Sequence, residues 1–234
     1  MDARGATGLP PDYSLHEGVY RSLRERNKAG WNDDHEYARM YELVRHLLPA
    51  ASAGPTPRVL ELGSGAGNFS MLLADKGYEV AGAEISPTAV AWANDRVRGS
   101  RAESAFRVDN VLDLSTFGDG EFDAVIDGHC LHCIIGADRA RCLAAAWRVL
   151  KPGGMLVVLT MCGEVLDERV GHLFDPSNRC VVVDGRPMRY IGIAEDISLE
   201  VARAGFEVRV ARVEPRRADD EQDDLVIQGF KPKA

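Results

Sequence analysis

The chain has 234 residues, of which 45% are hydrophobic and 27% charged, as suits a globular enzyme with a full α/β core. Its 28 Lys and Arg against 36 Asp and Glu give a net charge of −8, which disfavours nucleic acid and anionic membranes as partners. Five scattered cysteines indicate free thiols, and no leader or membrane-spanning run is evident, so we expect a cytoplasmic protein, either a monomer or a homodimer.

The first part of the chain, residues 1–57, is expected to be a flexible N-terminus followed by helices. Residues 1 to about 14 are rich in Gly, Pro and small side chains, which is typical of a mobile end. A helical period then follows, with Asn32 or Asp33 as a suitable N-cap and Pro49 as its end. The apolar positions that keep this period are Tyr37, Met40, Tyr41, Val44, Leu47 and Leu48.

A glycine-rich turn follows the first predicted strand. The apolar run Val59, Leu60 and Leu62 predicts a buried strand, and Gly63-Ser64-Gly65-Ala66-Gly67 ends it at once. The segment 69–77 has helical spacing. Glycine permits a tight turn and a close approach to a ligand, and a helix start offers free N–H groups. Strand, glycine turn and helix together predict a nucleotide site.

Strands and helices alternate through most of the remaining chain. Further strands are predicted at 79–85, 105–109, 122–127 and 155–162, and helices at 88–97, 138–150 and 195–204. Ser86 is a suitable N-cap and Pro87 suits the first helical position. This alternation predicts an α/β fold with a doubly wound parallel sheet.

Two segments depart from that alternation. Residues 163–194 form an insertion in which 180–183 and 188–191 flank Asp184-Gly185, a pattern that predicts a hairpin. The last strands are predicted at 206–213 and 225–230, and the acidic stretch 219–224 between them is expected to be a solvated loop.

From Glu61 to Asn68 the chain resembles the class I S-adenosylmethionine-dependent methyltransferases. Glu84, Asp109, Asp127 and Leu150-Lys151-Pro152-Gly153-Gly154 follow in that family's order, each beside a predicted strand. The resemblance covers roughly residues 58–231. It implies a Rossmann-like methyltransferase fold: a doubly wound seven-stranded, mostly parallel sheet with an antiparallel C-terminal strand. It also implies a methyltransferase domain over 58–234 and a helical lid within 1–57.

The resemblance implies S-adenosylmethionine as cofactor and S-adenosylhomocysteine as product. Glu61 is then placed for the cofactor's ammonium, Glu84 for the ribose hydroxyls and Asp109 for the adenine amino group. Otherwise Glu61 is a solvated strand end, Asp109 a cap and Ile85 a core residue. The predicted cofactor-binding residues are Glu61, Gly63, Ser64, Gly65, Gly67, Asn68, Glu84, Ile85, Asp109, Asn110, Val111, Asp127 and Gly128.

A nicotinamide or flavin dinucleotide is the competing interpretation of the glycine turn. Its fingerprint, Gly-x-Gly-x-x-Gly, needs glycine at position 68, where the chain has Asn68. A phosphate-binding P-loop needs Gly-Lys-Ser or Gly-Lys-Thr, which is absent from the turn. Both alternatives are therefore disfavoured.

The loop 127–133 follows the fourth predicted strand and should lie beside the reactive methyl group. Three interpretations remain open: His129 or His132 is a general base, with Asp127 part of the catalytic set; the His-Cys pairs bind a metal; or these residues only pack. Metal is disfavoured because all the ligands lie within five residues, so we predict no metal. Binding of a soft metalloid by the cysteines is likewise disfavoured against burial as small apolar residues.

The lid and the insertion are expected to supply acceptor contacts. The predicted substrate-binding residues are Tyr20, Trp31, His35, His129, His132, Arg179, Arg189 and Tyr190. We predict transfer of a methyl group to an O, N or S nucleophile of a small molecule by in-line displacement. The alternatives are a protein or peptide methyltransferase and a catalytically silent subunit that binds the cofactor. The sequence leaves the acceptor and the need for a base open.

Overall fold

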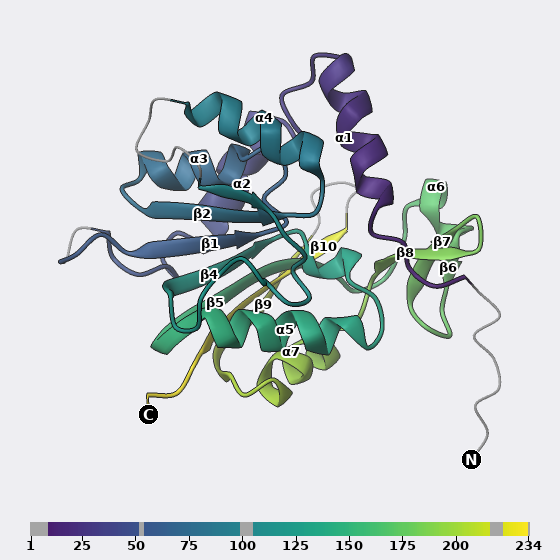
Figure 1. Ribbon diagram of the computed structural model, residues 1–234. Helices are drawn as coiled ribbons and strands as arrows, with labels where there is room; N and C mark the ends of the chain where they lie inside the picture. Colours follow the sequence, from purple (N-terminus) through teal and green to yellow (C-terminus); the bar gives the residue numbers. More distant parts are fainter. Residues whose placement is uncertain (1–8, 52–53, 99–104, 216–221, 234) are drawn as a thin grey trace.

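A seven-stranded sheet forms the centre of the computed structural model, which describes residues 9–51, 54–98, 105–215 and 222–233 (Figure 1). Its strand order is β3-β2-β1-β4-β5-β10-β9. The first five strands are parallel, and β10 runs antiparallel to both β5 and β9. The strands are β1 (Arg58–Leu62), β2 (Glu79–Glu84), β3 (Phe106–Val108), β4 (Phe122–Gly128), β5 (Leu150–Cys162), β9 (Glu207–Glu214) and β10 (Asp223–Phe230). The predicted fold is confirmed.

Helices cover both faces of this sheet (Figure 1). Helices α5 (Asp138–Val149) and α7 (Ala194–Arg203) pack on one face, and α2 (Asp34–Val44) and α3 (Asn68–Asp75) on the other. Successive side chains of a strand point to opposite faces. Val59 of β1 therefore joins the α2 and α3 core, whereas Leu60 joins the α5 and α7 core. Among the described residues, none of the helices has the length and apolarity needed to cross a membrane.

The predicted helix starts are confirmed by their caps. The Asp33 side chain accepts a bond from the Glu36 N–H at the start of α2. The Ser86 side chain accepts a bond from the Ala89 N–H at the start of α4 (Pro87–Val97), and Pro87 lies in the first turn of that helix. Side chains that accept from these otherwise free N–H groups fix where a helix begins.

The acidic stretch before the last strand departs from expectation. β10 begins at Asp223, so the prediction of a solvated loop is wrong for Asp223 and Asp224, while 219–221 lie outside the described residues. Asp224 is only 4% exposed. The reason is the pairing of Asp223 and Asp224 with the end of β5, at Cys162 and Met161. This register carries a carboxylate into the interior.

The insertion forms a separate small sheet beside the main one (Figure 1). It contains the short helix α6 (Glu168–Gly171) and the strands β6 (Phe174–Asp175), β7 (Cys180–Val183) and β8 (Arg186–Tyr190). The predicted hairpin is confirmed: β7 and β8 pair antiparallel around Asp184 and Gly185, whose φ angles are 50° and 75°. Positive φ at both positions is what a tight two-residue hairpin turn requires.

Helix α1 (Leu15–Glu25) lies across the start of α4. The Glu17 carboxylate accepts bonds from the hydroxyl groups of Ser86 (2.6 Å) and Thr88 (2.7 Å) and from the Thr88 N–H (3.2 Å). Partial burial would raise the pKa of Glu17, but these bonds outweigh it and lower the pKa to about 2. A carboxylate is favoured at a helix N-terminus, so this contact fastens α1 to the domain.

We predict that Glu17→Gln loosens α1, because the amide carries no charge and presents one acceptor oxygen. Hydrogen bonds to charged groups contribute about 1.5–3 kcal/mol, so even a partial loss of ~1 kcal/mol should speed amide exchange in α1 about fivefold. Hydrogen-exchange mass spectrometry at pH 7 measures this. The Glu17 contribution is complete above pH ~4.5 and is lost only as the pH falls towards 2.

The matched control is Glu25→Gln, at the exposed C-terminal end of the same helix. Unchanged exchange is expected for this variant. Equal exchange rates in the Glu17→Gln and Glu25→Gln proteins would show that Glu17 does not fasten α1.

Candidate active site

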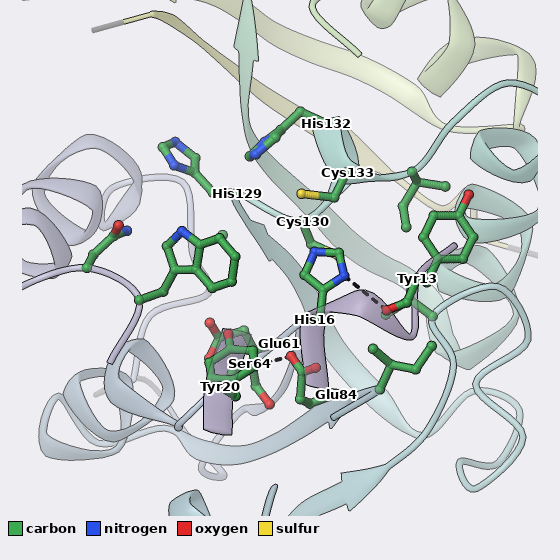
Figure 2. Close-up of a pocket in the computed structure, with 18 of the residues that line it drawn as sticks. Tyr13, His16, Tyr20, Glu61, Ser64, Glu84, His129, Cys130, His132 and Cys133 are labelled. Atoms are coloured by element: carbon green, nitrogen blue, oxygen red, sulfur yellow. Dashed lines mark hydrogen bonds between the residues drawn. The ribbon is translucent and has the colours of Figure 1, made fainter. Parts of the chain in front are cut away.

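A cavity lies at the carboxyl ends of β1, β2 and β4, under the N-terminal helices (Figure 2). In a parallel sheet these strand ends meet at one edge, where ligands of open α/β folds bind. The sequence-predicted cofactor residues that line it are Glu61, Gly63, Ser64, Gly65, Glu84, Ile85, Asp109, Asn110, Val111 and Gly128. Gly67, Asn68 and Asp127 were also predicted to bind the cofactor, but they are not among the lining residues.

Two buried carboxylates face this cavity. Glu61 is 3% exposed and accepts a hydrogen bond from the Ser70 hydroxyl, and burial raises the pKa of Glu61 to about 8. Glu84 accepts bonds from the N–H groups of Gly65 (3.0 Å) and Ser86 (2.8 Å), and burial raises its pKa as well. No Lys or Arg of the described chain forms an ion pair with either carboxylate. The pair therefore suits a ligand that brings its own cation and hydroxyl groups.

The three glycines of the turn have different surroundings. Gly65 has φ 54°, and a Cβ there would collide with the hydroxyl of Tyr20, which lines the cavity from α1. Gly67 has φ 78°, and a Cβ there would lie 2.9 Å from the Phe106 ring and 3.0 Å from Ala93. The missing side chain of Gly67 thus lets the turn pack closely against β3 and α4, and cofactor binding by Gly67 stays a prediction.

Asn68 also lies away from the cavity. Its side-chain oxygen accepts a bond from Arg96 (2.8 Å), and its amide nitrogen donates to the carbonyl of Ala29 (3.1 Å). Ala29 belongs to the segment between α1 and α2. Asn68 thus ties the N-terminal helices to the domain and does not line the cavity.

Asp109 lines the cavity, but both of its oxygens bond to its own loop. One oxygen accepts from the N–H of Ser115 (3.2 Å) and of Asn110 (2.8 Å), and the other from the N–H (2.9 Å) and hydroxyl (2.6 Å) of Thr116. This is the geometry of a loop cap. The apolar side chains of Ile85 and Val111 lie in the same part of the cavity.

Aromatic side chains from α1 and from the segment before α2 cover the cavity (Figure 2). The Trp31 ring lies 5.6 Å from Tyr20 and 5.9 Å from His16. Tyr20 and Trp31 were expected here, whereas His35 is exposed and lies outside the cavity. Tyr13 and His16 were missed, although they precede Tyr20 by seven and four residues, which are helical spacings.

The loop after β4 is built around two buried groups. Asp127 accepts bonds from the N–H groups of Cys130 (2.7 Å) and Leu131 (2.9 Å), which caps the short helix η1 (Leu131–Cys133). Burial raises the pKa of Asp127 to about 6, against these bonds. His132 is 5% exposed, and burial lowers its pKa well below the ordinary value, so its ring is neutral at pH 7. Asp127 therefore shapes the loop, and it is His132 that faces the cavity.

His129 forms a carboxylate–imidazole pair that the sequence did not reveal. Its Nε2 lies 2.9 Å from an oxygen of Asp224, and the other oxygen of Asp224 accepts a bond from Arg39 (2.5 Å) of α2. Burial would raise the pKa of Asp224, but the bonds from His129 and Arg39 outweigh it and lower the pKa. His129 has φ 69°, which turns its ring out of the strand direction. The carboxylate fixes which ring nitrogen carries the proton.

A second cavity adjoins the first, between α2, the end of β5 and the insertion. Asn32, His129, Met161 and Arg189 line both. Two insertion residues that were expected at the acceptor lie elsewhere. Arg179 donates to the carbonyls of Ile191 (2.7 Å) and Gly163 (2.5 Å), and Tyr190 packs under Arg139 at 4.4 Å. These contacts hold the insertion on the domain, which corrects both expectations.

The cysteines are protonated thiols at neutral pH. Burial raises the pKa of Cys133 to about 11 and that of Cys142 and Cys162 to about 12, and raises that of Cys130 further. Within the described residues, no group of three or more His, Cys, Asp or Glu side chains could hold a metal ion.

Comparison with known proteins finds one matching family and several similar enzymes. A family described as "Methyltransferase domain" matches residues 60–158. The ubiquinone/menaquinone biosynthesis C-methyltransferase UbiE of Vibrio campbellii is 30% identical over 176 residues, which cover 70% of this chain and 66% of that protein. The demethylmenaquinone methyltransferase of Thermus thermophilus is 36% identical over 117 residues, covering 49% of this chain and 52% of that protein. The chain thus aligns with about half to two thirds of these relatives' lengths.

Solved structures share the fold. The 1,6-didemethyltoxoflavin-N1-methyltransferase of Burkholderia thailandensis, solved with 1,6-didemethyltoxoflavin and S-adenosylhomocysteine, superimposes with a TM-score of 0.69 and 19% identity. The alignment covers 100% of this chain and 94% of that one. At this sequence identity, the similarity shows a shared arrangement of helices and strands and nothing more specific.

We predict that Glu61→Gln stabilises the ligand-free protein increasingly as the pH rises. Glu61 has a pKa of about 8 in the folded chain against an ordinary value of 4.5, so its contribution to stability is present below pH ~4.5 and is lost as the pH rises through about 8. Gln is neutral throughout and can still accept the Ser70 bond. The free-energy difference between the variant and the unmodified protein should grow by about 2–4 kcal/mol from pH 5 to pH 8.

Urea unfolding at several pH values measures this difference. Other titrating groups are common to both proteins and cancel in the comparison. If the free energies of unfolding of the two proteins changed in parallel with pH, Glu61 would be ionised in the folded chain over this range.

Proposed function

We propose that this chain, which belongs to the class I S-adenosylmethionine-dependent methyltransferases, transfers the methyl group of S-adenosylmethionine to a small molecule. One observation carries the proposal: the cavity with two buried, unpaired carboxylates shares lining residues, His129 among them, with a second cavity. One cavity suits the cofactor and the other the acceptor, with the point of transfer between them.

The residues of the first cavity fit the cofactor chemically. Glu61 would pair with the ammonium, Glu84 would accept bonds from ribose hydroxyls, and Ile85 would pack against adenine. The bound cofactor supplies a methyl group that is already activated on a sulfonium. The chain's own contribution is then alignment and the exclusion of water. A cation beside Glu61 favours its ionised form, so binding near pH 7 should release a proton.

An acceptor cavity set between α2 and the insertion favours a small molecule over a protein or peptide. In this proposal residues 58–234 form the methyltransferase domain, helices within 1–57 form its lid, and 163–194 covers the acceptor. The relatives are named as a C-methyltransferase of ubiquinone and menaquinone biosynthesis and a demethylmenaquinone methyltransferase, and the structural neighbour as a 1,6-didemethyltoxoflavin-N1-methyltransferase. The proposed acceptor atom is an oxygen, nitrogen or sulfur nucleophile. Carbon is a further candidate, because the Vibrio campbellii relative is named a C-methyltransferase.

His129 is the general base of this proposal. Asp224 accepts the Nε2 proton of His129, which leaves Nδ1 with a lone pair for the acceptor's proton. The carboxylate also stabilises the imidazolium that forms, and Arg39 holds that carboxylate in place. Asp127 has a positioning part in this proposal, because one of its oxygens accepts bonds from the loop backbone.

Methyl-labelled cofactor tests the proposed function. We expect purified protein to transfer label to a compound in a small-molecule extract, and Glu84→Gln to bind the cofactor at least tenfold more weakly, a loss of about 1.4 kcal/mol or more. Calorimetry measures the binding. Glu79→Gln, at the exposed start of the same strand, is the control. Unlabelled extract with normal cofactor binding would favour the silent-subunit alternative.

We predict that His129→Gln lowers kcat on the labelled acceptor by about 10²-fold and removes the acid limb of the rate profile, because the base is lost. Asp224→Asn should lower kcat less, since the base is kept but its tautomer is no longer fixed. Steady-state kinetics from pH 5 to 9 measure both variants. His172→Gln, in the exposed part of the insertion, is the control. An unchanged pH profile in His129→Gln would remove His129 from the mechanism.

A further inference from the structure

The lining of the second cavity is partly apolar, and its other residues are polar or charged. The apolar part comes from the end of β5 and from the insertion, and its members are Met161, Val165, Val170, Val181 and Ile191. Apolar walls with a few convergent polar groups are usual for sites that bind small organic molecules. The body of an acceptor in this cavity is therefore hydrophobic, and the polar groups decide its chemical class.

Most charges in this cavity are already neutralised. Arg39 pairs with both Glu36 and Asp224, at 2.9 Å and 2.5 Å. Asp167 caps α6 and pairs with Arg169 at 2.9 Å. These groups have their partners within the chain and leave little electrostatic attraction for a ligand.

Arg189 is different. Its guanidinium group forms no hydrogen bond and no ion pair with any part of the chain that the structure describes. It is half-buried, and it lines both cavities where they join. Its place is fixed by β8, in which Arg189 pairs with Val181 of β7. A cation held in a half-buried site without a counter-ion is costly unless a ligand supplies one.

A second polar group at this junction also lacks a partner. His132 is 5% exposed, lines the first cavity, and its Nδ1 has no hydrogen-bond partner among the described residues. Burial first, and then electrostatic interaction with His129 and Arg189 nearby, lower the pKa of His132. The ring is thus a neutral hydrogen-bonding group beside the unpaired guanidinium, on the same side of the cavity as His129 (Figure 2).

We propose that the acceptor is a largely apolar small molecule with an anionic oxygen group, a carboxylate or an ionised hydroxyl, and that this group binds Arg189. The planar guanidinium fork matches two oxygens of such a group, and His132 adds a neutral hydrogen bond. The apolar body lies against Met161 and Ile191, which leaves the reacting atom beside His129 at the junction. The inference rests on the proposed function, because it identifies the acceptor of the same reaction.

Fractionation of the extract by charge tests the class of acceptor with the unmodified protein. Anion exchange at about pH 5 retains carboxylates, and a second passage of the unbound fraction at about pH 10 retains phenols and enols. Each fraction is incubated with the protein and methyl-labelled cofactor. Label in either retained fraction is the expected result, and its fraction distinguishes the two kinds of anion. Label confined to the final unbound fraction overturns this proposal while the proposed function stands.

Variants of Arg189 test whether this residue binds the anionic group of the acceptor. For the acceptor labelled in a retained fraction, Arg189→Met should raise KM about 10- to 100-fold, as expected for loss of a charged hydrogen bond, and should change kcat less. Arg189→Lys keeps the charge and should recover part of the loss. Arg186→Met is the control, because Arg186 lies on the same strand but donates to the carbonyl of Pro10.

The outcomes distinguish a failure of the Arg189 assignment from a failure of the proposed methyltransferase function. Cofactor binding by calorimetry should be the same in all three variants and the unmodified protein, which shows that the first cavity is intact. An unchanged KM in Arg189→Met overturns the assignment of Arg189. No label in any fraction overturns the proposed function, and this inference with it.

Discussion

The carboxylate of Asp224 joins three parts of the chain that are far apart in sequence. It accepts bonds from His129 at the end of β4 and from Arg39 on helix α2, and it is itself carried on β10. A buried carboxylate without such partners would be unstable. Helix α2, the loop after β4 and the last strand are therefore held in one arrangement, with His129 lining both cavities.

The parallel edge of the sheet buries two carboxyl groups without a basic partner among the described residues. Glu61 and Glu84 both lie at this edge with raised pKa values and without a basic partner. This arrangement destabilises the ligand-free protein, and a ligand with a positive charge and hydroxyl groups relieves it. A site built for binding commonly gives up some stability in this way.

The two coverings of the site contribute different chemistry. Helix α1 brings Tyr20 over the glycine turn and is fastened through Glu17 to the start of α4. The insertion brings the unpaired cation Arg189, while another of its arginines, Arg179, is bonded to backbone carbonyls and holds the insertion in place. Two residues of the same type, ten positions apart, thus have unlike roles because only one of them has partners within the chain.

The sequence alone determined the order of strands and helices, the glycine turn and the position of Glu84, because each depends on residues close together in the chain. It could not show that Gly67 faces the core, that Arg179 is bonded to backbone carbonyls, or that Asp224 is buried beside His129. Those contacts join residues up to 95 positions apart, and they depend on which strands become neighbours in the folded sheet. Strand pairing is a property of the whole fold, so tertiary structure alone decided the partners of the site residues.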